Sequence, residues 1–90
     1  MKFVWDERKR TANLAKHNLD FEEIIHFGWS RAVIEPGTPS STNKPRFKAV
    51  GFFEEELAIV IFALLGTEAI SIISFRTASS IEKRKFHAQA

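Results

Sequence analysis

Basic side chains gather in two short segments of this sequence. Lys44, Arg46 and Lys48 fall within five residues, and Glu82 lies inside the second segment. The cations of that second segment are Arg76, Lys83, Arg84 and Lys85. Clustered Lys and Arg side chains can bind phosphate, and Glu82 or the distant His17 could transfer protons. These residue types suit chemistry on a polyanion.

Each of these groups also has a structural interpretation. Ser79 and Glu82 have the spacing of a capping box, in which the Glu side chain serves a helix N-terminus. His17 falls near the end of a predicted helix, where a cation is stabilised without any catalytic task. Residues 83–85 fit the solvated face of a helix. Arg76 interrupts apolar sequence at a strand end, which has no comparable structural reason unless it pairs with a carboxylate.

The remaining histidines and the tryptophans are interpreted as structural. His26 and His87 have no partner at metal-ligand spacing, so the sequence predicts no metal site. Trp5 and Trp29 are expected in the core rather than as platforms for base stacking.

Composition predicts one globular domain covering residues 1–90. The chain is 44% hydrophobic and 27% charged, which is ordinary for a globular protein, and it has no cysteine for disulfides or thiolate catalysis. Its first residues are already charged, so no secretory signal is expected and the cytoplasm is the predicted location. The longest apolar run, Leu57–Leu65, is about half of the roughly 20 residues that a membrane-spanning helix needs. The net charge of +2 does not by itself decide for nucleic-acid binding.

Local signals predict the helices. Asp6 is an acceptable N-cap for a helix at 7–17, and Asn18 can adopt the left-handed conformation that ends it. Asp20 and Glu23 have capping-box spacing, which predicts a short second helix at 21–27. A closing helix is expected from about Ser79, with an apolar side made of Ala78, Ile81 and Phe86.

Alternating and apolar runs predict the strands. A short edge strand is expected at 2–5, and further strands at 31–35, 46–54, 57–65 and 69–75. All three prolines lie in a predicted loop at 36–45. The run at 57–65 is apolar on both faces and should be central. We therefore predict an α+β fold, with helices packed on one face of a small antiparallel meander.

Three segments in order along the chain share the pattern of one protein family. The opening segment, "VWDERKRTANLAKHNLDFEEI", supplies Trp5-Asp6, Lys9, Asn13 and Lys16-His17. The middle segment, "KPRFKAVG", supplies Arg46 and Gly51. The closing segment, "ISIISFRTASSIEKRKF", supplies Ile73, Ser74, Arg76, Ala78, Glu82, Lys83 and Phe86. In these residues the chain resembles the BrnT toxins of type II toxin–antitoxin systems, which are ribonucleases related in fold to RelE.

The resemblance implies metal-independent RNA cleavage without a cofactor, in which a ribose 2′-hydroxyl attacks the adjacent phosphorus and translation and growth are inhibited. It implies catalytic roles for Arg76, Glu82, His17 and Lys83, and RNA-binding roles for Arg46, Lys48, Arg84 and Lys85. Which group is the base and which the acid stays open. The implied partner is a BrnA-like ribbon-helix-helix antitoxin, with operator DNA reached only through that antitoxin, and no membrane is involved.

Two positions depart from the family pattern and leave a second function open. Thr77 and Lys83 stand where family members often carry arginine. Lys provides charge but not the bidentate fork of Arg. The alternative is therefore a catalytically weak or inactive relative that binds an antitoxin or nucleic acid.

Overall fold

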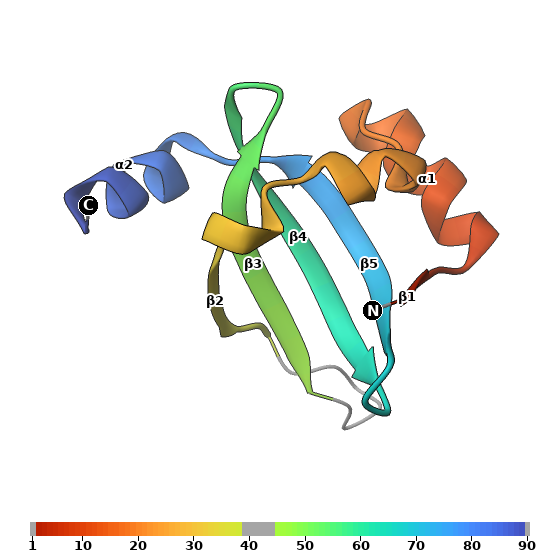
Figure 1. The fold of residues 1–90 in the computed structure, drawn as a ribbon. Helices are drawn as coiled ribbons and strands as arrows, with labels where there is room; N and C mark the ends of the chain where they lie inside the picture. Colours follow the sequence, from red (N-terminus) through yellow and green to blue (C-terminus); the bar gives the residue numbers. More distant parts are fainter. Residues whose placement is uncertain (1, 39–44, 90) are drawn as a thin grey trace.

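The computed structural model describes residues 2–38 and 45–89, and Figure 1 shows them as a twisted sheet flanked by helices. In chain order the elements are β1 (Lys2–Val4), α1 (Glu7–His17), the 3₁₀ helices η1 (Phe21–His26) and η2 (Trp29–Arg31), β2 (Val33–Pro36), β3 (Arg46–Phe53), β4 (Glu56–Leu65), β5 (Ala69–Thr77) and α2 (Ser80–Ala88). The predicted α+β class is confirmed.

The five strands form one mixed sheet in the order β1-β5-β4-β3-β2. Strands β2 to β5 pair antiparallel as predicted, and the apolar β4 lies at the centre. Strand β1 pairs parallel to β5, with Lys2 opposite Ala69, so the prediction of a purely antiparallel sheet is wrong. The chain between β1 and β5 is long enough for a crossover in either direction, so the sequence of β1 alone does not fix its orientation.

The first helix was predicted correctly, because its ends carry strong local signals. The Asp6 side chain accepts a hydrogen bond from the Arg8 amide at 2.8 Å. Asn18 ends α1 in the left-handed region, at φ 59°. This conformation is tolerated by Asn better than by most residues.

The second predicted helix is a 3₁₀ helix instead. Three aromatic and aliphatic side chains, Phe21, Ile24 and Phe27, are almost fully buried, and they recur at every third position. A spacing of three matches the three residues per turn of a 3₁₀ helix, so this winding directs all of them into the core. The expected capping box does not form, because the Asp20 side chain accepts from the Glu22 amide and Glu23 pairs weakly with His26.

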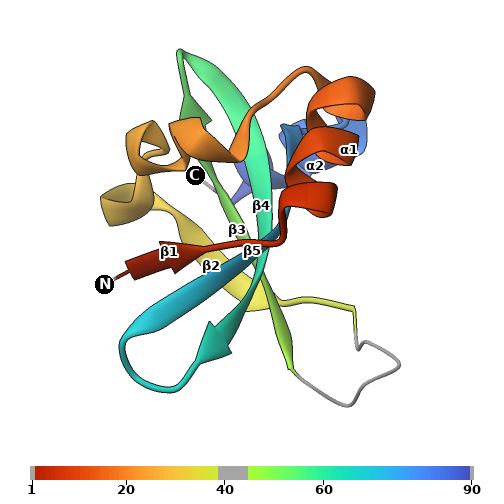
Figure 2. The same cartoon turned by 90° about the vertical axis from the view of Figure 1, so that its right-hand side faces the viewer.

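Both faces of the sheet are covered, which corrects the prediction that the helices share one face. The larger core lies on the η1 side and contains Phe21, Ile24, Phe27, Ala49, Phe53, Ala58, Val60, Phe62, Ile72 and Phe75. The smaller core lies on the α2 side and contains Val50, Leu57, Ile59 and Ala78, with Ile61 and Phe86 packed against it. Figure 2 shows η1 and α2 on opposite sides of the sheet. A strand that is apolar on both faces, such as β4, needs a cover on each.

Three smaller predictions are also corrected. Ile81 does not belong to an apolar side of α2, because it is 70% exposed. The strand predicted at 31–35 begins at Val33, since Trp29–Arg31 winds into η2 first. Pro36 lies in β2 rather than in the loop, and residues 39–44, including Lys44, fall outside the described residues.

Candidate active site

One buried side chain fixes α1 to the edge of β5. Asn13 is 7% exposed, and its Nδ2 donates to the Phe75 carbonyl at 2.7 Å and to the Leu19 carbonyl at 3.0 Å. Its Oδ1 accepts from the Phe75 amide at 3.1 Å and from the Ser74 hydroxyl at 3.4 Å. Strand β1 ends before it reaches Phe75. The side-chain amide of Asn13 makes the hydrogen bonds that a neighbouring strand would otherwise make there. The polar side chains of α1 are thereby fixed relative to the sheet.

Beside this contact lies a surface depression of about 300 Å³, which we call the basic hollow. Helix α1 supplies Lys9, Lys16 and His17, and β3 supplies Arg46. The rest of the lining is Ala12, Asn13, Ile73 and Ser74. Residues 9, 13, 16 and 17 lie on one face of α1, because three or four residues make one helical turn.

The cations of the basic hollow have no carboxylate partner in residues 2–38 and 45–89. The ion pairs there involve Arg10, His26, Lys48 and Arg76, and none involves Lys9, Lys16 or Arg46. Every Asp and Glu side chain of the sequence belongs to those described ranges. Unpaired cations that share one depression favour an anionic ligand, since each adds to the same local potential.

His17 is the titratable group of the hollow that is suited to take a proton. Burial lowers the pKa of its imidazole, and the neighbouring charges of Lys16 and Arg76 lower it further. A histidine held as a cation at a helix C-terminus would instead have a raised pKa. The side chain is therefore neutral at pH 7, which is the state that a general base requires.

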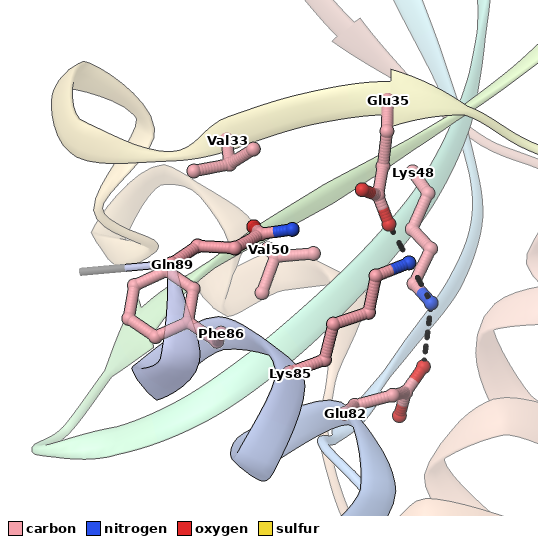
Figure 3. Close-up of a pocket in the computed structure, with 8 residues that line it drawn as sticks. All are labelled: Val33, Glu35, Lys48, Val50, Glu82, Lys85, Phe86 and Gln89. Atoms are coloured by element: carbon pink, nitrogen blue, oxygen red, sulfur yellow. Dashed lines mark ion pairs between the residues drawn. The ribbon is translucent and has the colours of Figure 1, made fainter.

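A second cluster, the Glu82 clamp, lies next to the hollow and consists of Lys48, Arg76, Ser79 and Glu82. Arg76 donates from Nη1 and Nη2 to the two carboxylate oxygens of Glu82 at 2.7 and 2.9 Å. Lys48 Nζ lies 2.7 Å from Glu82 Oε2 and 3.9 Å from Glu35 Oε1. Figure 3 shows Lys48 between the two carboxylates. Arg76 thus pairs with a carboxylate, which gives this arginine at a strand end a structural reason as well.

The same carboxylate caps α2. The Ser79 amide donates to Glu82 Oε1 at 2.8 Å, and the Glu82 amide donates to the Ser79 hydroxyl at 3.2 Å, which completes the predicted capping box. The hydrogen bonds from Arg76, Lys48 and the Ser79 amide hold the pKa of Glu82 far below its usual range. Glu82 is therefore ionised throughout the physiological pH range, and it has no proton to donate.

The other predicted site residues lie on α2. Lys85 lines a small pocket with Glu35, Lys48 and Glu82, and Figure 3 shows its side chain pointing into that space. Lys83 is half-buried and Arg84 is exposed, and the described part of the chain gives neither an ion pair. The roles predicted for these three residues stay predictions.

Lys9, Lys16 and Ser74 belong to the hollow but were not predicted as site residues. Lys9 and Lys16 were visible in the sequence, since their spacing of seven puts both on the face of the helix that carries Asn13. Ser74 carries no such local signal.

Both tryptophans are partly buried and pack against the larger core, which agrees with their predicted structural role. Trp29 Nε1 donates to the Ile24 carbonyl at 2.9 Å, and the Trp5 ring meets Phe21 edge-on at 6.2 Å.

Neither α1 nor α2, the α-helices in the described ranges, is long and apolar enough to cross a membrane.

Fold and site together define a small α+β protein whose sheet carries a cationic surface. Comparison with family models matches residues 5–82 to the ribonuclease toxin BrnT of type II toxin–antitoxin systems. The chain is also similar to the crystal structure of the Brucella abortus ribonuclease toxin BrnT, with a TM-score of 0.73 and 40% identity. That match covers 89% of this chain and 99% of the other. Comparison with curated proteins gave no match.

The chain belongs to the BrnT family of ribonuclease toxins of type II toxin–antitoxin systems. Membership implies an RNA substrate, and it implies an antitoxin as partner. The cationic surface is consistent with the first of these.

Proposed function

We propose that this protein is an endoribonuclease that cleaves RNA in the cytoplasm without a metal ion, and that the basic hollow binds the scissile phosphate. The observation that supports this most strongly is the set of three cations, Lys9, Lys16 and Arg46, that have no carboxylate partner within residues 2–38 and 45–89. A pentavalent phosphorane carries more negative charge than the phosphodiester. Cations fixed in advance around it lower the barrier, because they need not reorganise during the reaction.

In this mechanism His17 accepts the proton of the ribose 2′-hydroxyl, and the oxygen then attacks the adjacent phosphorus. The bond from phosphorus to the 5′-oxygen breaks, which leaves a 2′,3′-cyclic phosphate, and the departing 5′-oxygen takes up a proton. Arg46, with its planar fork, stabilises the charge on the phosphoryl oxygens, and Lys9 and Lys16 add to the local potential. Arg76 was predicted to be catalytic, but Glu82 occupies its guanidinium, so we instead assign it, with Lys48 further along the same face of the sheet, to binding of the RNA backbone. Lys83 keeps its predicted catalytic role near the leaving group, and Arg84 and Lys85 extend the RNA surface along α2.

Glu82 fits a positioning role better than an acid or base role. Its carboxylate is ionised, it accepts three hydrogen bonds from Arg76 and Ser79, and it lies against Lys48 as well. We propose in addition that the fold is RelE-like.

We expect cleavage to survive chelation. Purified protein incubated with RNA in excess EDTA should cut at its normal rate, because side chains of the protein supply both the charge stabilisation and the proton transfer. Gel analysis of the time course with and without EDTA measures this. Loss of activity on chelation, restored by Mg²⁺, would contradict a metal-independent mechanism.

The proposed partner is a BrnA-like ribbon-helix-helix antitoxin that blocks the hollow, prevents inhibition of translation and growth, and alone contacts operator DNA. An acidic antitoxin segment would be attracted by Arg46 and its neighbours and would associate faster. We expect the double change Arg46→Glu with Arg76→Glu to weaken co-purification with the product of the neighbouring gene. Undiminished co-purification by the folded variant would contradict the electrostatic contact.

A second candidate function is a catalytically weak or inactive relative that binds its antitoxin or nucleic acid. It is favoured by the pairing of Arg76 with Glu82, and by Thr77 and Lys83 in place of arginine. Induced expression in a bacterial host separates the two functions, because a ribonuclease toxin arrests growth and a binding module does not.

A further inference from the structure

We propose that Lys48 and Arg76 form a second phosphate subsite for RNA, which the protein's own Glu82 carboxylate fills until RNA displaces it. The inference rests on the proposed function, since it adds a backbone contact beside the scissile phosphate. It identifies Glu82 as an internal mimic of the substrate and not as a reacting group.

The geometry of the clamp matches a phosphate as well as a carboxylate. The two terminal nitrogens of Arg76 each meet one oxygen of Glu82, at 2.7 and 2.9 Å, and Lys48 Nζ meets the second oxygen at 2.7 Å. A planar guanidinium binds two oxygens of a phosphodiester with the same fork. Removing the carboxylate would therefore leave a preformed two-cation site.

The subsite and the basic hollow are separated by about the distance between two successive phosphates of RNA. On β3, Lys48 follows Arg46 by two residues and points to the same face of the sheet. On β5, Arg76 follows Ser74 by two residues, and Ser74 lines the hollow. Two residues along a strand span roughly 6–7 Å. This step is comparable with the separation of successive phosphates in an extended RNA strand.

Helix α2 can release Glu82 without loss of the main core. No residue of α2 is fully buried, and the helix rests on the sheet mainly through Phe86. Its next apolar residue, Ile81, faces solvent. Rotation of the Glu82 side chain, or a small shift of α2, therefore exposes Lys48 and Arg76 while the larger core on the other face stays intact.

Binding of a non-cleavable RNA tests the subsite separately from catalysis. We would measure the affinity of a 2′-O-methyl oligonucleotide for the Glu82→Gln protein by fluorescence anisotropy. Gln can still accept from the Ser79 amide and keep the cap. We expect binding roughly tenfold tighter than wild type, the scale of one charge-assisted hydrogen bond.

Glu35→Gln is the matched control, because it removes one negative charge in the same pocket but does not contact Arg76. It should change affinity less than about twofold, as expected for a weak, partly exposed pair. Combining Glu82→Gln with Arg76→Gln should abolish the gain. Equal affinities for the Glu82→Gln and Glu35→Gln proteins, or weaker binding by the former, would overturn the proposal.

Lys48→Gln provides a second test if Glu82→Gln fails to fold, because it leaves the Arg76 pair and the cap in place. The subsite predicts weaker RNA binding, and unchanged binding would overturn it. Failure of the proposed function gives a different result. A protein that never cleaves RNA could still bind RNA more tightly after the Glu82→Gln change. Normal cleavage together with equal affinities would instead remove the subsite alone.

Discussion

Replacing His17 with Ala should slow RNA cleavage by a factor of about 10²–10⁴, the usual range for loss of a general base. The side chain lines the basic hollow beside Lys16 and Arg46, and burial together with nearby cations keeps it neutral. The loss should appear mainly in kcat, because the remaining cations still bind the phosphate. Single-turnover cleavage at saturating protein measures it directly.

The matched control is His26→Ala, which removes an exposed histidine of η1. Its rate should equal that of wild type. A His17→Ala protein that is folded and cleaves normally would contradict the role of His17.

The pH profile follows from the same assignment. Burial and the nearby cations lower the pKa of His17, so the base stays neutral to lower pH than an ordinary histidine and becomes protonated as the pH falls further. We expect kcat/KM to be constant above that pKa and to decline at lower pH, with the decline absent from the residual activity of the His17→Ala protein. A decline that persists unchanged in the variant would assign it to another group.

Replacing the buried Asn13 with Leu should lower the free energy of unfolding by about 2–5 kcal/mol. The change leaves the Phe75 amide and carbonyl without partners in a buried place. It also removes the attachment of α1 to β5. Urea unfolding followed by circular dichroism measures the cost.

Asn18→Gly is the control for this prediction. Asn18 lies at the end of α1 at φ 59°, a conformation that Gly adopts without penalty, so stability should change by only a few tenths of a kcal/mol. Asn13→Leu with wild-type stability would mean that α1 does not depend on this side chain.

Local signals in the sequence predicted the elements with clear ends. Asp6 and Asn18 bound α1, and the alternation of β3 correctly placed Ala49 on one face and Lys48 on the other. The pairing of Ser79 with Glu82 was visible from spacing alone. In each case the deciding interaction joins residues within a few positions of one another, or follows from the period of a single element.

Features that depend on distant contacts were missed or only partly predicted. The 3₁₀ winding of η1 follows from the burial of Phe21, Ile24 and Phe27 against a sheet formed later in the chain. The parallel pairing of β1 depends on β5. The basic hollow combines α1, which packs on β5, with Arg46 of β3, and the bonds from Asn13 that place α1 span 62 positions of sequence.

The central claim is that the basic hollow is the site of phosphate chemistry. The cleavage rate of the Arg46→Ala protein in EDTA tests it most directly. Arg31→Ala is the control, since Arg31 is exposed on η2 and lines no part of the hollow. Both variants lose one positive charge, so long-range attraction of RNA falls equally. We predict a loss of about 10²–10³ for Arg46→Ala, the scale of one transition-state donor, and a rate near wild type for Arg31→Ala. Equal rates for the two folded variants would contradict the assignment of the basic hollow as the active site.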